Sequence, residues 1–471
     1  MREQELFIDG TWIRTDRVDE IHDRWTGEVI GRVHRASPEH AVAAVDAAAA
    51  ALQRGFPVPE RAALLSRVSD YIAAHSEEFA QSITAEVGKP ITASRLEVSR
   101  AVSTLQFAAE EARRLPSETV PLDATAAGAG MIGFTIAQPI GIVAAITPFN
   151  FPLNLVAHKI GPAIAAGCPV VLKPSDRTQL TAGLLIDAFI ASGLPAGQLN
   201  LVTGSPDDVV TAWQEDDRVA VVTFTGSSKV GWLLKAASPR KLHVLELGSN
   251  TAMVVAADAD LERAAKDTVG ASLTNSGQAC VSLQRVYVHR SIAEHYLEAV
   301  RLRFDAVVTG DPRNDDTVVG PLVADSEVGR IESWLAEAVA SGARILAGGT
   351  SEGSVLAPTL IADVSADDRV VCEEVFGPVV AVTAFDDLDE AIGLVNDSLY
   401  GLNTSIYTAS IGAALDYARR AEAGTVLVNV PPSFRADQMP YGGVKDSGQG
   451  REGVKYAVAE LTEQKLVILS A

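Results

Sequence analysis

Two short stretches organise the fold expected of this chain: Leu245-Glu246-Leu247-Gly248-Ser249-Asn250 and Thr274-Asn275-Ser276-Gly277-Gln278-Ala279-Cys280. They carry a carboxylate, Glu246, and a thiol, Cys280. Residues 252–275 are typical of a strand, a turn and a helix, so the fold can bring the two side chains back together. Such a pair suits covalent catalysis, in which a thiolate attacks an electrophilic carbon and a carboxylate later activates water against the thioester.

Composition narrows the class of protein. The chain has 471 residues, enough for two or three domains, with a hydrophobic fraction of 47% and a charged fraction of 21%. These fractions are typical of soluble globular proteins. The net charge of −21 argues against nucleic acid or an anionic membrane surface as a partner.

Three cysteines, Cys168, Cys280 and Cys372, form neither a disulfide framework nor a pattern of metal ligands. The first residues lack the apolar core of a signal peptide, and no apolar stretch is long and continuous enough to span a bilayer. We therefore expect a cytoplasmic protein with reduced thiols, no membrane partner and no bound metal.

The order of elements predicts an α/β fold. A small β segment at 6–34 and a helical run at 40–115 precede strands and helices that alternate up to Leu247. This alternation indicates a parallel, doubly wound sheet, and a second alternation after Leu247, beginning with a strand at 252–256, indicates a second α/β domain. The apolar tail at 464–470 is typical of a strand that pairs, and it could extend a partner subunit's sheet.

Taken together, the chain resembles the aldehyde dehydrogenase superfamily along nearly its whole length. The motifs that carry the resemblance are Phe7–Trp12, Thr147–Pro152, Lys173–Ser175, Phe224–Gly231, Glu246–Gly248, Asn275–Cys280, Glu374–Pro378 and Pro440–Gly448. Each is weak alone, but their number, order and spacing make the probability of chance agreement very small.

The resemblance implies a division of the chain. It implies a Rossmann-type dinucleotide-binding domain at 1–118 and 138–245 and an α/β catalytic domain at 246–430. Residues 119–137 and 454–471 would supply oligomerisation strands. It also implies a homodimer or homotetramer.

The resemblance assigns roles to four catalytic candidates. Cys280 would be the nucleophile, although a free cysteine is more often a small buried apolar residue. Asn150 would hold the oxyanion through its side-chain amide, together with the backbone N–H of Cys280, where the alternative is a turn residue. Lys159 would support this arrangement, or would be an ion-paired lysine.

Glu246 would be the general base for thioester hydrolysis, where the alternative is a solvated carboxylate at a strand end. Family members that pass the acyl group to coenzyme A generally lack a carboxylate at this position. The presence of Glu246 therefore predicts a free acid as the product.

The cofactor site lacks the GxGxxG spacing. Instead, Gly226 and Ser227 open a helix after a strand, so that backbone N–H groups and the helix dipole can face a pyrophosphate. The resemblance adds further cofactor-binding candidates: Thr147, Pro148, Phe149, Lys173, Ser175, Asp176, Gly204, Thr225, Leu247, Gly248, Glu374 and Phe376. Asp176 stands where NAD-preferring members usually have Glu, and Arg177 could neutralise a phosphate, so we expect NAD with NADP as the alternative.

Two residues point to the substrate. His158 stands where many members have Trp, and Arg435 lies in the stretch Pro432–Pro440. Neighbouring stretches resemble the branch that includes lactaldehyde and glyceraldehyde-type enzymes. Polar and cationic residues in a substrate tunnel suit a small polar or anionic aldehyde, whereas the alternatives are a hydrogen-bonded helix histidine and a loop-anchoring ion pair.

We therefore expect NAD(P)-dependent oxidation of a small aldehyde to the carboxylic acid. The path would run through a thiohemiacetal on Cys280 and a thioester hydrolysed by water that Glu246 activates. One rival is a coenzyme A-acylating semialdehyde dehydrogenase. The other is a binding protein that kept the fold but lost turnover.

Overall fold

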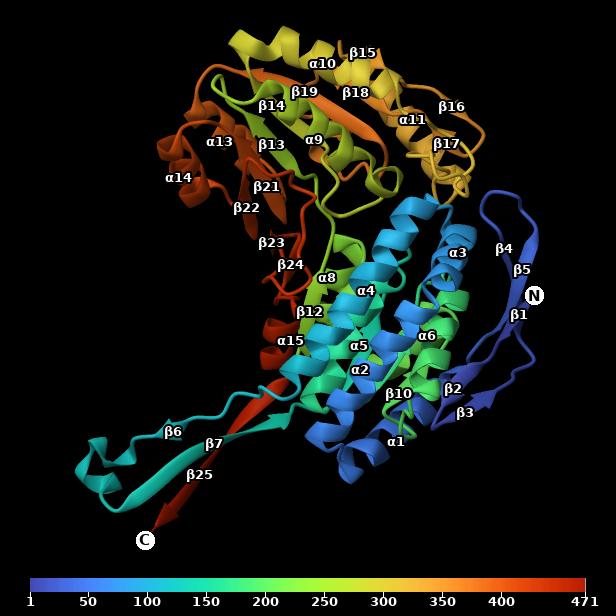
Figure 1. The fold of residues 1–471 in the computed structure, drawn as a ribbon, viewed down its shortest axis with the longest axis vertical. Helices are drawn as coiled ribbons and strands as arrows, with labels where there is room; N and C mark the ends of the chain where they lie inside the picture. The colour runs from blue at the N-terminus through green and yellow to red at the C-terminus, as the bar shows by residue number, and fades with distance from the viewer. Residues whose placement is uncertain (471) are drawn as a thin grey trace.

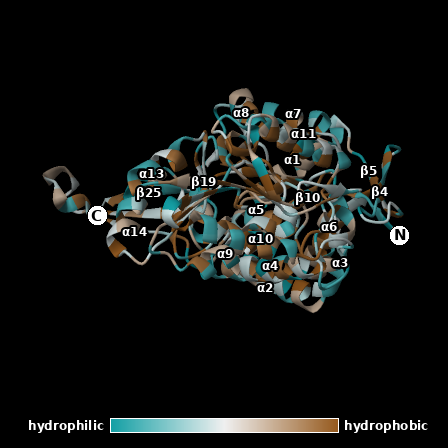
Figure 2. Cartoon of the chain, turned by 90° about the horizontal axis from the view of Figure 1, so that it is seen from above, coloured by the Kyte–Doolittle hydropathy of each residue, from teal (hydrophilic) through white to brown (hydrophobic). Residues whose placement is uncertain are grey.

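The structure is a computed structural model that describes residues 1–470. It contains two bodies, each built around a mostly parallel sheet, and a three-stranded arm that projects from them (Figure 1). Figure 2 shows many of the apolar residues along the strands in the middle of the bodies. The α/β fold class expected from the sequence is confirmed.

The first body is built on an eight-stranded sheet in the order β24-β12-β11-β8-β9-β10-β2-β3. Its strands are β2 (Leu6–Ile8), β3 (Thr11–Ile13), β8 (Ile142–Ile146), β9 (Val170–Lys173), β10 (Leu199–Leu201), β11 (Val219–Thr225), β12 (Leu242–Glu246) and β24 (Gly448–Gln449). The five strands from β12 to β10 in this order are parallel, and antiparallel strands continue the sheet on both sides. A separate small sheet contains β1 (Arg2–Gln4), β5 (Val29–His34) and β4 (Val18–His22).

Helices cover both faces of this sheet. One face packs against α1 (Pro38–Arg54), α7 (Pro206–Glu215) and α8 (Ser228–Ala237). The other packs against α2 (Val58–Ala74), α3 (Ser76–Val87), α4 (Ile91–Glu111), α5 (Asn154–Ala166) and α6 (Gln179–Ala191). The sequence of β8, Ile-Val-Ala-Ala-Ile, has no polar alternation because all five residues are buried between these layers.

The parallel register brings several motifs to one edge of the sheet. Ile146 at the end of β8 lies beside Lys173 at the end of β9 and beside Phe224 in β11, and Thr225 lies beside Glu246 at the end of β12. The segments that come after these strands therefore meet at the carboxyl edge, where ligands bind in open α/β sheets.

The second body is built on a seven-stranded sheet in the order β15-β18-β19-β14-β13-β21-β22, in which β15 is the antiparallel member. Its strands are β13 (Ala252–Val255), β14 (Arg285–His289), β15 (Arg344–Ala347), β18 (Thr359–Ala362), β19 (Val379–Phe385), β21 (Asn403–Tyr407) and β22 (Thr425–Val428). Its helices are α9 (Leu261–Leu273), α10 (Ala293–Asp305), α11 (Asp325–Ala340), α12 (Arg369–Cys372), α13 (Leu388–Asn396) and α14 (Ile411–Arg420).

Short elements complete the chain. Two-stranded pairs are β16 (Ser351–Glu352) with β17 (Val355–Leu356), and β20 (Tyr400–Gly401) with β23 (Val444–Lys445). The short 3-10 turns are η1 (Leu122–Ala124), η2 (Ala126–Gly128), η3 (Thr274–Gly277) and η4 (Arg290–Ile292).

The arm consists of β6 (Thr119–Val120), β7 (Met131–Pro139) and β25 (Thr462–Ser470), with β25 at one edge. The apolar tail pairs within its own chain, since all of β25 is antiparallel to β7. The expectation of strand over the whole of 454–471 is wrong for its first part, which forms helix α15 (Val454–Glu460). Val454, Ala457 and Val458 of this helix are buried, and it packs against α5 and α4.

Within residues 1–470, no helix combines the length and the apolar character needed to cross a membrane. The same residues contain no group of three or more His, Cys, Asp or Glu side chains arranged to hold a metal ion.

Candidate active site

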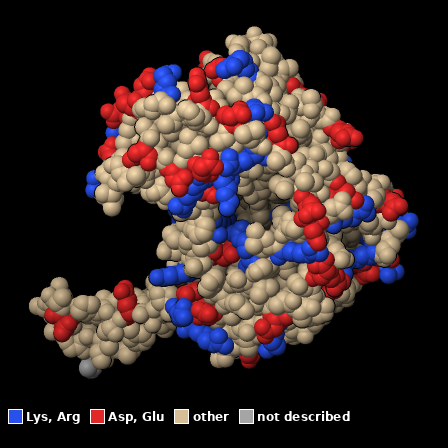
Figure 3. All heavy atoms as spheres, turned by 45° about the horizontal axis from the view of Figure 1, so that its top comes forward, with Lys and Arg blue, Asp and Glu red and all other residues tan. Residues whose placement is uncertain are grey.

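Cys280 lies where two cavities meet. The larger has a volume of about 520 Å³ and extends along the carboxyl edge of the eight-stranded sheet from Lys173 and Asp176 to Cys280. The smaller, of about 340 Å³, is lined by α4, the start of α5 and the segment around Arg435. Cys280 is the one residue that lines both. Figure 3 shows a hollow between the two bodies with basic side chains along its rim.

A strained turn places this cysteine. After α9 ends at Leu273, Asn275 and Ser276 adopt left-handed backbone angles, with φ of 51° and 56°. Gly277 follows with φ of 76°, and a Cβ there would lie 2.2 Å from the carbonyl carbon of Gly377. Non-glycine residues hold such angles only where their surroundings enforce them, and they cluster at functional sites.

The Cys280 side chain is half-buried, and its sulfur hydrogen-bonds to the Tyr441 hydroxyl, with 3.2 Å between Sγ and Oη. Burial raises the pKa of the thiol to about 11. The structure therefore does not activate the cysteine by a depressed pKa.

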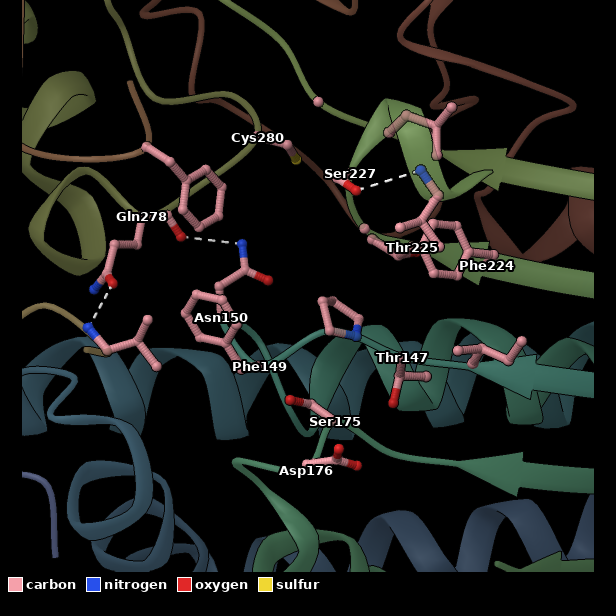
Figure 4. Close-up of a pocket in the computed structure, with 18 of the residues that line it drawn as sticks. Thr147, Phe149, Asn150, Ser175, Asp176, Phe224, Thr225, Ser227, Gln278 and Cys280 are labelled. Atoms are coloured by element: carbon pink, nitrogen blue, oxygen red, sulfur yellow. Dashed lines mark hydrogen bonds between the residues drawn. The ribbon is translucent and has the colours of Figure 1, made fainter. Parts of the chain in front are cut away.

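Asn150 lies beside Cys280, in the loop between β8 and α5. Its Nδ2 donates to the Gln278 carbonyl oxygen over 3.0 Å, which uses one of the two amide N–H groups and leaves the other available. Figure 4 shows Asn150, Gln278 and Cys280 around one space, with Thr225 and Ser227 across it.

A buried ion pair fixes the loop that carries Asn150. Lys89 Nζ and Glu97 Oε2 are 2.6 Å apart, and both side chains are fully buried. Lys89 also donates to the Asn150 carbonyl oxygen over 3.0 Å. The other Glu97 oxygen accepts from the backbone N–H groups of Leu153 and Asn154 and so caps the start of α5.

Two buried carboxylates near the thiol have opposite environments. Neither oxygen of Glu246 has a hydrogen-bond partner within residues 1–470. Burial and the neighbouring charge of Glu452 raise the pKa of Glu246 well above its usual value. Burial also opposes ionisation of Glu452, but Lys159 and Arg435 outweigh it and lower the pKa of Glu452. Glu246 is close enough to Cys280 for its charge to oppose ionisation of the thiol.

Lys159 acts through Glu452. Its Nζ is 3.0 Å from Glu452 Oε1 and donates to the Thr223 hydroxyl over 3.0 Å, and it makes no hydrogen bond to Asn150 or Cys280. The ion-paired alternative is thus the observed state of this lysine. Glu452 in turn accepts from Arg435 over 2.9 Å.

The two predicted substrate residues have different positions. Arg435 lines the small cavity, with its guanidinium 3.8 Å from the centre of the Tyr441 ring. His158 does not line that cavity, and its Nε2 instead contacts Asp437 Oδ1 at 3.0 Å. The prediction that both residues face the tunnel is therefore wrong for His158. Asp437 also accepts two hydrogen bonds from Arg100, which does line the cavity.

The large cavity collects the predicted cofactor residues. Those that line it are Thr147, Pro148, Phe149, Lys173, Ser175, Asp176, Thr225, Gly226, Ser227, Leu247, Gly248, Glu374 and Phe376. Gly204 does not, because it packs against the backbone of Ala36. Lys173 forms an ion pair with Asp176, with 2.8 Å between Nζ and Oδ1.

The large cavity fits a dinucleotide. The hydroxyls of Thr147 and Thr225 are buried there with no hydrogen-bond partner within residues 1–470. The N-terminus of α8 opens into it at Ser227, where backbone N–H groups and the helix dipole suit a pyrophosphate. Glu374 lies against Gly248, where a Cβ would be 2.4 Å from Oε2, and burial raises the pKa of Glu374 to about 7.

The comparisons with known proteins agree with this geometry. The model of the "Aldehyde dehydrogenase family" matches residues 12–467. A 3-sulfolactaldehyde dehydrogenase of Priestia aryabhattai is 40% identical over 470 residues, covering 100% of this chain and 98% of the relative. A lactaldehyde dehydrogenase of Methanococcus vannielii is 36% identical, with coverages of 98% and 99%.

Solved structures of aldehyde dehydrogenases also match the chain over nearly its whole length. Aldehyde dehydrogenase 21 from Physcomitrella patens, in complex with the reaction product succinate, superposes with a TM-score of 0.97 at 37% identity, covering 100% of this chain and 98% of that one. The NADP-dependent glyceraldehyde-3-phosphate dehydrogenase from Bacillus halodurans C-125, complexed with NADP, gives 0.97 at 32% identity, with both coverages 99%. The chain therefore belongs to the aldehyde dehydrogenase family, as the motifs predicted, and is an oxidoreductase that acts on an aldehyde.

Several residues of the site were not predicted from the sequence: Lys89, Glu97, Arg100, Tyr441, Asp437 and Glu452. Tyr441 stood inside a quoted motif, and Glu452 four residues beyond its end. A signal was present in α4, where Glu97 falls on the buried face, since a buried carboxylate needs a partner.

Replacing Glu97 with alanine should destabilise the protein. The change leaves the Lys89 charge buried without its partner and removes the cap of α5. It should lower the free energy of unfolding by about 3–5 kcal/mol, seen as a lower thermal midpoint. The control, Glu110→Ala on the same helix, breaks an exposed pair with Arg114 and should change stability by less than about 1 kcal/mol. Equal effects of the two changes would contradict the role given to Glu97.

Proposed function

We propose that the chain oxidises an aldehyde to the free carboxylic acid through a covalent intermediate on Cys280. The observation that carries the proposal is the position of this thiol at the junction of the two cavities, one suited to a dinucleotide and one to a small substrate. We assign dinucleotide binding to residues 1–118 and 138–245, and the chemistry to the domain at 246–430.

The first step forms a bond between the Cys280 sulfur and the aldehyde carbon. The carbonyl oxygen then carries negative charge, and the free N–H of Asn150 stabilises it. An oxyanion donor of this kind contributes about 2.7–4 kcal/mol to transition-state stabilisation in other enzymes. A nicotinamide dinucleotide bound in the large cavity supplies the two-electron oxidant.

The last step uses Glu246. Its carboxylate accepts a proton from water, the water oxygen bonds to the thioester carbon, and the carbon–sulfur bond breaks to release the acid. The raised pKa of Glu246 makes it a stronger base than an ordinary carboxylate, which suits the removal of a proton from water. A carboxylate at this place favours hydrolysis over acyl transfer to coenzyme A.

We further propose NAD as the preferred dinucleotide. Asp176 lines the large cavity and brings negative charge, which would repel a 2′-phosphate. Its ion pair with Lys173 reduces that repulsion, and relatives use either form: one similar structure is complexed with NADP, and that from Sinorhizobium meliloti is described as NAD-dependent. NADP therefore stays the alternative.

Variants of the two reacting groups test this proposal with a panel of short aldehydes, run with NAD and with NADP. Cys280→Ser should lower turnover at least about a thousandfold. Glu246→Gln should lower it about 10²–10⁴-fold. The rate at which the parent hydrolyses the thioester should rise with pH as Glu246 loses its proton, because the raised pKa keeps it protonated at lower pH, and the Gln variant should lose this dependence.

Cys372→Ser is the matched control, since Cys372 is an exposed cysteine outside both cavities and its loss should leave turnover unchanged. An active Cys280→Ser variant would contradict the covalent mechanism. A product formed as acyl-coenzyme A would favour the acylating alternative, and no turnover with any aldehyde would favour a binding protein.

We propose that the substrate is a short aldehyde with an anionic group. The charged groups that line the small cavity, or that are linked to its wall through a chain of ion pairs, are Lys89, Arg100, Lys159 and Arg435, against Glu97, Asp437 and Glu452. Cations thus outnumber carboxylates by one when Glu246 is protonated. Burial lowers the pKa of His158, which keeps this histidine neutral.

The positively charged wall of the small cavity also has an unpaired hydrogen-bond donor. Nε of Arg435 is buried with no hydrogen-bond partner within residues 1–470. A single negative charge on the substrate would balance the wall, which fits the sulfolactaldehyde named for one relative and the succinate named for one similar structure. A neutral aldehyde would leave the charge unbalanced.

Arg100→Met tests the anionic preference. The change keeps an unbranched side chain but removes one cation, so a four-carbon aldehyde with a terminal carboxylate should lose kcat/KM about tenfold or more relative to a neutral four-carbon aldehyde. Arg114→Met, an exposed arginine just beyond the end of the same helix, should leave the ratio unchanged. An unchanged ratio in Arg100→Met would show that this cation does not select the substrate.

We also propose that the arm joins copies of the chain into a homodimer or homotetramer. Large apolar side chains are exposed on both long strands: Met131, Ile132, Ile136, Leu466, Ile468 and Leu469. Exposed apolar edge strands usually pair. A monomeric mass in light scattering would contradict this assignment.

A further inference from the structure

One group in contact with the nucleophile has no role in the steps above. The Tyr441 hydroxyl lies 3.2 Å from the Cys280 sulfur, and Tyr441 is 1% exposed. Within residues 1–470, the sulfur is the sole hydrogen-bond partner of this hydroxyl. Its position is therefore not explained by another contact that merely satisfies a buried phenol.

The main chain around Tyr441 holds the ring in place. Its backbone N–H and C=O exchange hydrogen bonds with those of Glu452, over 3.0 and 2.6 Å. Gly442 follows with φ of 157°, where a Cβ would lie 2.7 Å from the Gly450 carbonyl oxygen and 3.0 Å from Glu246 Oε1. The Arg435 guanidinium stacks on the ring, which restrains it from the side.

We propose that Tyr441 is a further catalytic residue, whose hydroxyl donates a hydrogen bond to the Cys280 sulfur and stabilises the thiolate relative to the thiol. The inference rests on the proposed role of Cys280 as the nucleophile. It adds a group that acts on the sulfur before the aldehyde is attacked.

The physical basis is a difference between the two states of the sulfur. With a neutral thiol, either the S–H or the O–H can be the donor. When the thiol loses its proton to solvent, the tyrosine alone can donate, and a hydrogen bond to an ionised acceptor is roughly twice as strong as a neutral one. The contact therefore favours the thiolate.

The other groups that act on the sulfur do not replace this effect. Burial opposes ionisation most strongly, Tyr441 and Arg435 favour it, and Glu374 and Glu246 oppose it when charged. Burial also raises the pKa of Tyr441 well above its usual value. The phenol thus stays a protonated donor while the thiol titrates.

Tyr441→Phe tests the proposal, because it removes the hydroxyl and keeps the ring on which Arg435 stacks. The measurement is the rate at which iodoacetamide alkylates Cys280 as a function of pH, without dinucleotide. Peptide masses separate this site from the exposed Cys372. The profile should shift to higher pH, with alkylation at a fixed pH on its rising limb about tenfold slower than in the parent.

Tyr296→Phe is the matched control. Tyr296 is also fully buried, and its hydroxyl contacts Thr268 at 2.6 Å in the core of the second body, away from both cavities. It should leave the profile unchanged. A parental profile in Tyr441→Phe, or the same shift in both variants, would overturn the proposal.

If Tyr441→Phe does not fold, a monofluorinated tyrosine at 441 gives the opposite change, since its hydroxyl is a stronger donor. The alkylation profile should then shift to lower pH, and an unchanged profile would overturn the proposal. The role of Cys280 and the role of Tyr441 are tested by different results. Aldehyde oxidation that survives complete alkylation of Cys280 would refute its role as the nucleophile. The pH profile of alkylation reports on Tyr441 alone.

Discussion

The site depends on two buried carboxylates, Glu246 and Glu452, whose surroundings shift their pKa values in opposite directions. Glu452 lies between Lys159 and Arg435 and stays charged, whereas Glu246 has no hydrogen-bond partner within residues 1–470 and is held toward its neutral form by burial and by Glu452. Two carboxyl groups whose pKa values are driven apart can take different roles. Glu452 is held by its ion pairs next to the small cavity, whereas Glu246 has no such partner and can accept a proton.

The fixed carboxylate links the parts of the site. Through Arg435 it holds the segment that carries Tyr441 and borders the small cavity, and through Lys159 it ties that segment to the buried helix α5. On the other side of the thiol, the Lys89–Glu97 pair holds the loop of Asn150. The buried charges in these pairs neutralise one another. The excess positive charge of the wall and the unpaired Nε donor of Arg435 therefore stay available to a ligand.

Residues directly after a parallel strand were predicted best from the sequence. The α/β class and the candidates after β8, β9, β11 and β12 could be predicted because parallel strands end at one edge. Contacts between distant segments could not be predicted in this way. Gly204 packs on Ala36, and the His158 side chain contacts Asp437 instead of lining the small cavity. Neither contact could be predicted, because neither periodicity nor a motif states which face of a buried helix meets which loop. Arg100 was missed for the same reason.

The proposed mechanism requires that Cys280 carries the acyl group and that Glu246 removes it. The most direct measurement is the mass of the Cys280 peptide from the Glu246→Gln variant, quenched in acid after mixing with an aldehyde and a dinucleotide. This mechanism predicts that the peptide gains the mass of the acyl group, that the adduct needs both ligands, and that the parent hydrolyses it. An unmodified Cys280, or an acyl group on another residue, would contradict this mechanism.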